Sequence, residues 1–379
     1  FWNRRIGSSA LVDDAVQKAL ARIGVAVQVS PANLLFAPEA VRTKSGEPFR
    51  VFTPFWRAAT ALGPPRAPLA RPRALPGPPP GIRSHPLDAL ALLPTRPNWA
   101  DGLRETWTPG EAGAVERLAA FIRSDIARYA IERDEPGKPA TSMLSPHLRF
   151  GEISPFRVWA MLDKASPTPS VGKFRSELGW REFAYHLLAG MPDLHEKNFN
   201  PAFDLFPWKA PERGVVEAWQ RGMTGYPIVD AGMRQLWHTG WMHNRVRMIV
   251  ASFLTKHLLV DWREGERWFW DTLVDADPAS NPFGWQWVAG SGADAQPYFR
   301  IFNPVLQSEK FDSDGAFVRR WVPEIAGLPD RFIHQPWAAS PLELAAAGIV
   351  LGREYPGPMV DHAAARARAL AAYDRIKGR

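Results

Sequence analysis

The stretch WQRGMTGYPIVDAGMRQLWHTGWMHNRVRMIV, residues 219–250, decides the fold of this chain. Its apolar side chains recur at helical spacing over 229–238 and again over 242–259, which predicts two amphipathic helices. The same spacing predicts further helices over 110–131, 155–164, 171–189, 214–221, 263–274 and 363–377. No internal repeat accompanies them, so we expect one large all-α domain.

The N-terminal part, residues 1–61, has a sequence pattern different from that of the predicted helical domain. Asp13 and Asp14 supply a capping signal before an apolar stripe at helical spacing that Gly24 ends, and 25–29 is predicted to be a short buried strand. A helix followed by a strand is half of a βαβ unit, so residues 1–61 are predicted to be part of an α/β domain whose earlier strands lie upstream of Phe1. Because 62–97 contains 11 prolines and no periodic pattern, 62–105 is predicted to be a linker to a helical domain at 106–379.

Composition excludes several classes of protein. The 379 residues include no Cys, which excludes disulfides, thiolate zinc sites and iron–sulfur clusters and favours a reducing, cytoplasmic setting. No apolar run approaches the ~20 residues of a membrane span. The net charge of +7 lies entirely in residues 1–105, with 14 basic and 7 acidic residues, whereas 106–379 hold 32 of each.

One stretch, 231–260, contains basic residues and no acidic residue. It carries Arg234, Arg245, Arg247 and Lys256, with Trp237 and Trp241 between them. Such a pattern suits a nucleic-acid backbone beside unstacked bases, and it also suits a basic helix face in solvent. A second polar cluster, 141–145, has three hydroxyls, which suit either a phosphate or an ordinary helix cap.

Several long runs occur in a fixed order along the chain: SPHLRFGEISP (145–155), FRSELGWREFAYHLL (174–188), the opening stretch, and NPFGWQWVAGSGADAQPYFRIFNP (281–304). Together they resemble the DNA photolyase/cryptochrome family, most of all a class I cyclobutane pyrimidine dimer photolyase. WNRR (2–5) and KSGEPFRVFTPFWRA (44–58) are similar to the end of that family's antenna domain. The resemblance implies an N-terminally truncated α/β antenna domain and an all-α FAD-binding domain.

The resemblance also implies which residues bind FAD. Thr141, Ser142, Met143, Leu144 and Ser145 are expected at the phosphates; the family often has Arg at the position of Met143. In the loop VDADPASN, Asp277 is expected to accept from the flavin or ribose, Asp275 to pair with Arg247, and Asn281 to lie by the flavin N5. The other implied cofactor contacts are Tyr129, Phe174, Glu177, Asn244 and Ala276.

A flipped-out dimer in damaged DNA is expected to meet Glu177, Trp180, Arg181, Asn244, Arg245, Met248 and Trp287. Asn244 and Met248 are four residues apart and share a helix face, while Arg245 is turned away and is free to meet a phosphate. Glu177 and Trp180, three residues apart, should share another face.

Nine of the 17 Trp residues fall between Trp208 and Trp287. The resemblance implies that Trp208, Trp262 and Trp285 form a chain of redox-active indoles from the surface to the flavin.

The predicted function is therefore that of a deoxyribodipyrimidine photo-lyase. Excited reduced FAD lends an electron to the dimer, and Glu177 and Asn244 act on that dimer. UV-damaged DNA is the predicted partner of a monomer, no metal site is predicted, and a second chromophore, a reduced folate or a deazaflavin, is not assigned. The alternatives are a signalling cryptochrome, a (6-4) photoproduct enzyme (a subgroup with His at the positions of Asn244 and Met248), and a Trp-rich protein that binds single-stranded nucleic acid without a cofactor.

Overall fold

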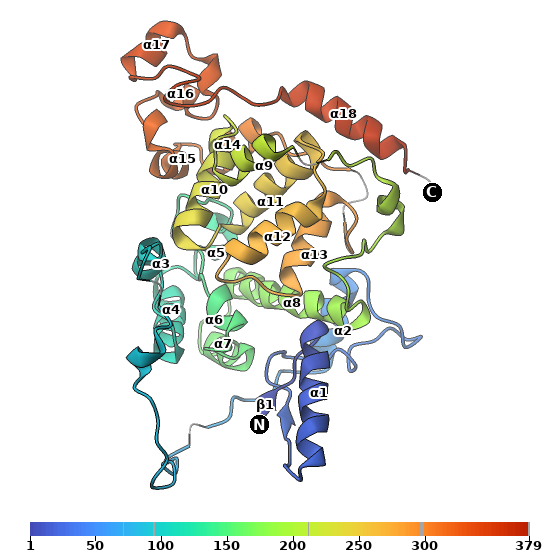
Figure 1. Ribbon diagram of the computed structural model, residues 1–379. Coiled ribbons are helices and arrows are strands. Elements are labelled where there is room, and N and C mark those ends of the chain that lie inside the picture. Colours follow the sequence, from blue (N-terminus) through green and yellow to red (C-terminus); the bar gives the residue numbers. More distant parts are fainter. Residues whose placement is uncertain (71, 94, 211, 296–298, 378–379) are drawn as a thin grey trace.

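The computed structural model describes residues 1–70, 72–93, 95–210, 212–295 and 299–377. A small N-terminal part joins a large helical body through an extended segment (Figure 1). Within these ranges, none of the helices combines the length and apolar character that a membrane crossing needs.

The N-terminal part contains one parallel strand pair and two helices. β1 (Trp2–Asn3) pairs with β2 (Val29–Ser30), and α1 (Ser8–Arg22) connects them. The prediction of a buried strand at 25–29 was wrong, because β2 has two residues and both are exposed. α1 begins at Ser8, so Asp13 and Asp14 lie inside it, and the prediction that they cap its start was wrong. Gly24 ends α1 as predicted, with a φ of 76° that a side chain would strain.

α2 (Phe52–Ala61) fixes this part to the helical body. Its buried Phe52 and Phe55 pack against Phe183 of α8 (Pro169–Gly190), with Phe55 and Phe183 centroids 5.2 Å apart. The buried Glu182 carboxylate adds a polar link, since it accepts a hydrogen bond from the backbone N–H of Phe36 at 3.1 Å. Burial raises the pKa of Glu182 to about 7.

The proline-rich segment is exposed and irregular where it is described, apart from the short 3₁₀ helix η1 (Leu87–Leu90). α3 (Asp101–Thr106) follows, so the predicted boundary at residue 105 falls inside a helix. Trp107 ties the end of α3 to the body, because its indole N–H donates to the carbonyl of Thr239 at 2.7 Å.

Every predicted helix of the body is present, and two are interrupted. The helix predicted over 110–131 ends at Ser124, where the N–H groups of Asp125 and Ile126 both donate to the Phe121 carbonyl at 2.9 Å, and a short helix follows. The helix predicted over 242–259 starts at Asn244, capped by His243, and its end widens into a π turn. The helices of the body are α4 (Glu111–Ser124), α5 (Tyr129–Glu132), α6 (Ser145–Arg149), α7 (Pro155–Leu162), α8, η2 (Pro201–Leu205), α9 (Arg213–Gln220), α10 (Pro227–Thr239), α11 (Asn244–Ser252), η3 (Phe253–His257), α12 (Trp262–Thr272), α13 (Ser280–Ala289), α14 (Pro304–Phe311), α15 (Ala316–Trp321), η4 (Pro323–Ile325), α16 (Asp330–Ile333), η5 (Pro336–Ala338), α17 (Pro341–Ala346) and α18 (His362–Asp374).

α10 and α11 form the centre of the largest apolar cluster, together with α12 and α13. Gly232 lets α10 and α11 approach closely, because a Cβ at this position would lie 2.4 Å from a methyl group of Val246. α8 lies between this cluster and the N-terminal part (Figure 1). The face of α8 that is turned towards this cluster can line a site together with α11 and α13.

Candidate functional site

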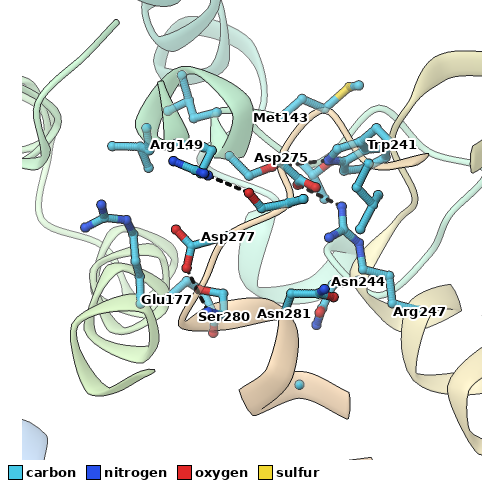
Figure 2. Close-up of a pocket in the computed structure, with 18 of the residues that line it drawn as sticks. Met143, Arg149, Glu177, Trp241, Asn244, Arg247, Asp275, Asp277, Ser280 and Asn281 are labelled. Atoms are coloured by element: carbon cyan, nitrogen blue, oxygen red, sulfur yellow. Dashed lines mark hydrogen bonds and ion pairs between the residues drawn. The ribbon is translucent and has the colours of Figure 1, made fainter. Parts of the chain in front are cut away.

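A cavity of about 350 Å³ lies where α5, α6, α8, α11 and α13 meet (Figure 2). This volume is within the range of about 300–1,000 Å³ that is usual for ligand sites. All predicted cofactor contacts line it: Tyr129, Thr141, Ser142, Met143, Leu144, Ser145, Phe174, Glu177, Asn244, Arg247, Asp275, Ala276, Asp277 and Asn281. Arg181, Met248 and Trp285 line it as well. Residues distant in sequence thus converge on one cavity, and their contacts with FAD stay a prediction.

The segment 141–145 forms one wall. Met143 has a φ of 49°, a left-handed conformation that is unfavourable for a residue with a side chain and is frequent at ligand sites. Ser145 begins α6, and its hydroxyl oxygen accepts from the indole N–H of Trp241 at 3.3 Å. Within the described ranges, the hydroxyls of Thr141 and Ser142 have no hydrogen-bond partner, so they are available to a ligand.

The loop 275–281 forms the opposite wall and contains the predicted ion pair. Arg247 donates to Oδ2 of Asp275 at 2.8 Å, and the Asp275 side chain is only 3% exposed (Figure 2). Its other oxygen, Oδ1, is buried and has no partner in the described structure. A buried, unpartnered acceptor is costly for the protein alone, and a ligand donor would relieve that cost.

Asp277 is held firmly by the protein itself. Its Oδ1 accepts from the backbone N–H groups of Ala279 at 2.9 Å and Ser280 at 2.7 Å, which caps the start of α13. Its Oδ2 accepts from the hydroxyl of Tyr185 at 2.7 Å. A further contact from Asp277 to a flavin or ribose stays a prediction.

Asn281 is oriented by a residue that the sequence analysis missed. Its amide nitrogen donates to the Glu266 carboxylate at 2.9 Å and to the Glu266 carbonyl at 3.1 Å. The amide oxygen of Asn281 is therefore the atom left for the cavity, which the residue lines. Burial raises the pKa of Glu266. Nothing in the motif DADPASN pointed to Glu266, because it lies 15 residues upstream, on another helix.

Two pairs of residues were predicted to share a helix face, and the structure confirms one pair and not the other. Asn244 and Met248 share a face of α11 and both line the cavity, as predicted. Glu177 also lines it and forms ion pairs with Arg133 and Lys173, the latter at 3.2 Å. Trp180 does not share that face, because its ring stacks on Phe52 with centroids 3.7 Å apart.

Arg245 and Trp287 likewise lie outside the cavity. Arg245 was predicted to be free for a phosphate, but it forms an ion pair with Asp134 at 2.8 Å and lies over the ring of Phe311. The indole N–H of Trp287 donates to the carbonyl of Asp294 at 3.0 Å. DNA contacts by Trp180, Arg245 and Trp287 stay predictions that would need these packed side chains to be reached or moved.

The basic stretch 231–260 is largely neutralised, so the interpretation as a basic helix face in solvent was wrong, and contact of the stretch with a nucleic-acid backbone stays a prediction. Besides the pairs of Arg245 and Arg247, Arg234 forms an ion pair with Glu324 at 2.7 Å. Lys256 is 1% exposed, and burial lowers its pKa well below the usual value. The acidic partners come from distant parts of the sequence, so a local absence of acids did not produce a free basic surface.

Of the three predicted relay indoles, only Trp285 lines the cavity. Its ring contacts those of Phe269, with centroids 4.9 Å apart, and Trp219, at 6.2 Å. Trp262 is fully buried, with its N–H donating to the Asn198 side chain at 2.9 Å. Trp208 lies against Phe206, and the backbone bridge between Lys209 and Val260 brings its segment beside that of Trp262. The relay itself stays a prediction.

The lining fits FAD. Four arginines (Arg133, Arg149, Arg181 and Arg247) face three carboxylates (Glu177, Asp275 and Asp277), so the cavity carries an excess of positive charge that suits a diphosphate. Arg149, which sequence analysis missed, donates to the Ala276 carbonyl at 2.5 Å. Two buried polar atoms of lining residues, the acceptor Oδ1 of Asp275 and the donor Nε1 of Trp285, have no partner in the described structure and are available to the polar groups of a ligand.

Comparisons with known proteins agree with this lining. Residues 174–375 match the family model described as the FAD binding domain of DNA photolyase, and residues 1–74 match the DNA photolyase model. The deoxyribodipyrimidine photo-lyase of Agrobacterium fabrum is 54% identical over 99% of this chain and 79% of that protein. Cryptochrome-1 of Arabidopsis thaliana is 37% identical over 97% of this chain and 56% of that protein.

A solved structure is similarly close. The crystal structure of a bacterial class III photolyase from Agrobacterium tumefaciens superposes with a TM-score of 0.95 at 54% identity, covering all of this chain and 79% of that one. Its description as class III gives no support to the predicted likeness to class I.

Proposed function

We propose that this chain, which belongs to the DNA photolyase family, repairs cyclobutane pyrimidine dimers in UV-damaged DNA. The repair would need light and would use FAD as the cofactor. Photolyase-type repair follows from the family and from relatives that carry the name deoxyribodipyrimidine photo-lyase. The cyclobutane dimer as substrate is our own proposal.

The observation that carries the proposal is the convergence of the segment 141–145, the loop 275–281 and α11 on one cavity. Bound FAD would supply the light-driven transfer of one electron to the dimer and its return. The residues of the chain would hold and orient the cofactor and the dimer. We propose that Thr141 and Ser142 bind the phosphates and that Arg247, fixed by Asp275, stabilises negative charge near the flavin.

Glu177, Asn244 and Met248 are proposed to hold the flipped-out dimer. Each lines the cavity, and Asn244 offers an amide that can read a base edge. Glu177 is restrained by Arg133 and Lys173, so its carboxylate is positioned before the substrate arrives. The (6-4) enzymes that this family also contains have His where this chain has Asn244 and Met248, which favours the cyclobutane dimer.

A cryptochrome-type photoreceptor is the second candidate, because cryptochrome-1 is among the relatives. The two functions differ in what light produces: repaired DNA, or a protein partner bound only after illumination. Asn281 and the runs GWMHNRVRM (240–248) and WQW (285–287), which resemble those of the repair enzymes, favour repair.

We also propose the arrangement of the chain: an α/β antenna part at 1–61, a linker at 62–105 and a catalytic domain at 106–379. A monomer that acts in the cytoplasm on cellular DNA is proposed as well. Limited proteolysis within 62–97 that releases a stable fragment starting near residue 100 would support the boundaries. A dimer by light scattering would contradict the monomer.

The test is repair of two DNA substrates, one with a cyclobutane thymine dimer and one with a (6-4) photoproduct, in blue light and in darkness. We expect loss of the cyclobutane dimer in light only and no change in the (6-4) product. Equal loss in darkness, or no loss in light by flavin-loaded protein, would contradict the proposal.

A further inference from the structure

The wall that carries Thr141, Ser142 and Met143 has a second cavity on its other side. This cavity measures about 950 Å³ and shares those three residues and Trp241 with the first. The segment 141–143 is therefore a thin partition, and a charge placed behind it acts on whatever the segment binds in front.

Arg117 of α4 lines this second cavity directly behind the segment. One terminal nitrogen lies 3.8 Å from the sulfur of Met143, and the other donates to the Thr106 carbonyl at 3.1 Å. The guanidinium also lies over the ring of Trp107, 5.1 Å from its centroid. A thioether is a weak acceptor, so the nitrogen beside Met143 is held loosely.

In the part of the chain that the structure describes, Arg117 has no carboxylate partner. Burial lowers its pKa, and no acid opposes that shift. The acids of the same cavity are engaged elsewhere: Glu116 with Arg123 at 3.1 Å, Asp125 with Arg128 at 2.9 Å, and Glu105 near His238 at 3.8 Å. A partly buried cation without a counter-ion is costly unless an anion arrives.

We propose that Arg117 adds a further cation that balances the FAD diphosphate from behind the segment 141–143. This inference rests on the proposed function, because it takes the segment as the phosphate site. The donors that the segment itself presents, hydroxyls and backbone N–H groups, are neutral. A guanidinium behind the segment strengthens such a site because its positive charge attracts the phosphates across the thin partition, where little water screens it.

The experiment measures FAD release from the purified holoprotein, followed by the rise in flavin fluorescence after dilution, at several salt concentrations. We expect Arg117→Gln to release FAD about tenfold faster and with less dependence on salt, and Arg117→Lys to be intermediate. Arg123→Gln is the matched control, since Arg123 lies on the same helix, is 64% exposed and should leave release unchanged.

A second variant distinguishes the loss of the positive charge from the loss of a structural role of Arg117. Met143→Arg, introduced into Arg117→Gln, returns a guanidinium to the partition and should restore slow release. If Arg117→Gln releases FAD at the wild-type rate and salt dependence, the inference is overturned while the proposed function stands. If the variant loses thermal stability and Met143→Arg does not restore retention, Arg117 acts through Thr106 as a structural residue, which also overturns the inference. Wild-type protein that binds no FAD would instead overturn the proposed function.

Discussion

The loop 275–281 and the basic stretch 231–260 meet at one ion pair, Arg247 with Asp275, yet they differ in where their charged groups lie relative to the cavity. In the stretch, the other arginines have carboxylate partners from distant elements, and Lys256 is buried. At the cavity, Asp275 keeps a buried oxygen and Trp285 a buried N–H without any partner in the described structure. Buried polar atoms without a partner also occur in the stretch, at His243, Arg245 and His257. The comparison therefore shows only that a run of like charge does not by itself mark a binding surface, because distant elements can supply its ionic partners.

The largest expected effect concerns Trp285. Trp285→Phe keeps a ring in the cavity wall and removes the easily oxidised indole, so photoreduction of oxidised flavin should slow by about tenfold or more. Repair by enzyme that is reduced beforehand should change little. The rate of flavin bleaching under blue light is the measurement.

Trp287→Phe is its control, because that indole lies two residues along and outside the cavity. Equal slowing in both variants, or none in Trp285→Phe, would remove Trp285 from the relay.

The second prediction compares the ion pairs of the two regions. Asp275→Asn should lower the free energy of unfolding by about 3 kcal/mol and reduce bound flavin, because it leaves Arg247 without its buried partner. Glu324→Gln should cost about 1 kcal/mol and leave flavin content unchanged, since the Arg234–Glu324 pair is more exposed, at 22% and 24%. Urea unfolding with flavin absorbance measures both, and equal costs would contradict the comparison.

The third prediction uses pH within the basic stretch. Burial lowers the pKa of His243 to about 4, whereas an unfolded chain takes up this proton near pH 6.5. The unfolded state therefore binds more protons between these values, and stability falls as the pH drops from about 6.5 towards 4.

His243→Asn should reduce this loss by about 2 kcal/mol while keeping a residue that can cap α11. Denaturation midpoints at pH 7 and pH 5 test it. A variant as acid-sensitive as the wild type would show that His243 does not contribute.

The smallest effect is expected for DNA binding. Arg234 is already neutralised by Glu324, so Arg234→Gln should change the slope of log affinity against log salt by less than the 0.9 or so expected for one phosphate contact. Fluorescence anisotropy with damaged duplex DNA gives the slope. A decrease of about 0.9 in this slope, the value for one phosphate contact, would show that the stretch does face DNA.

The sequence predicted the helical body and most of the cavity lining, because helical spacing and long motifs are both local in the chain. It failed where a distant element decides the outcome. The strand predicted at 25–29 reduced to the exposed pair Val29–Ser30, and Trp180 turned to Phe52 of α2. Glu266 and Arg133 were missed for the same reason, because each acts on a predicted residue from an element that the motifs did not include. Arg149 lies within the motif 145–155, but its contact with Ala276 depends on the distant loop 275–281.

The central claim is that the cavity between the segment 141–145 and the loop 275–281 holds FAD. The most direct measurement is the absorption spectrum of the purified chain, with the flavin released on denaturation identified by mass and quantified against protein. The account predicts a flavin spectrum and FAD in an amount close to that of the protein, decreased by Asp275→Asn. A colourless chain that also takes up no FAD from solution would contradict it.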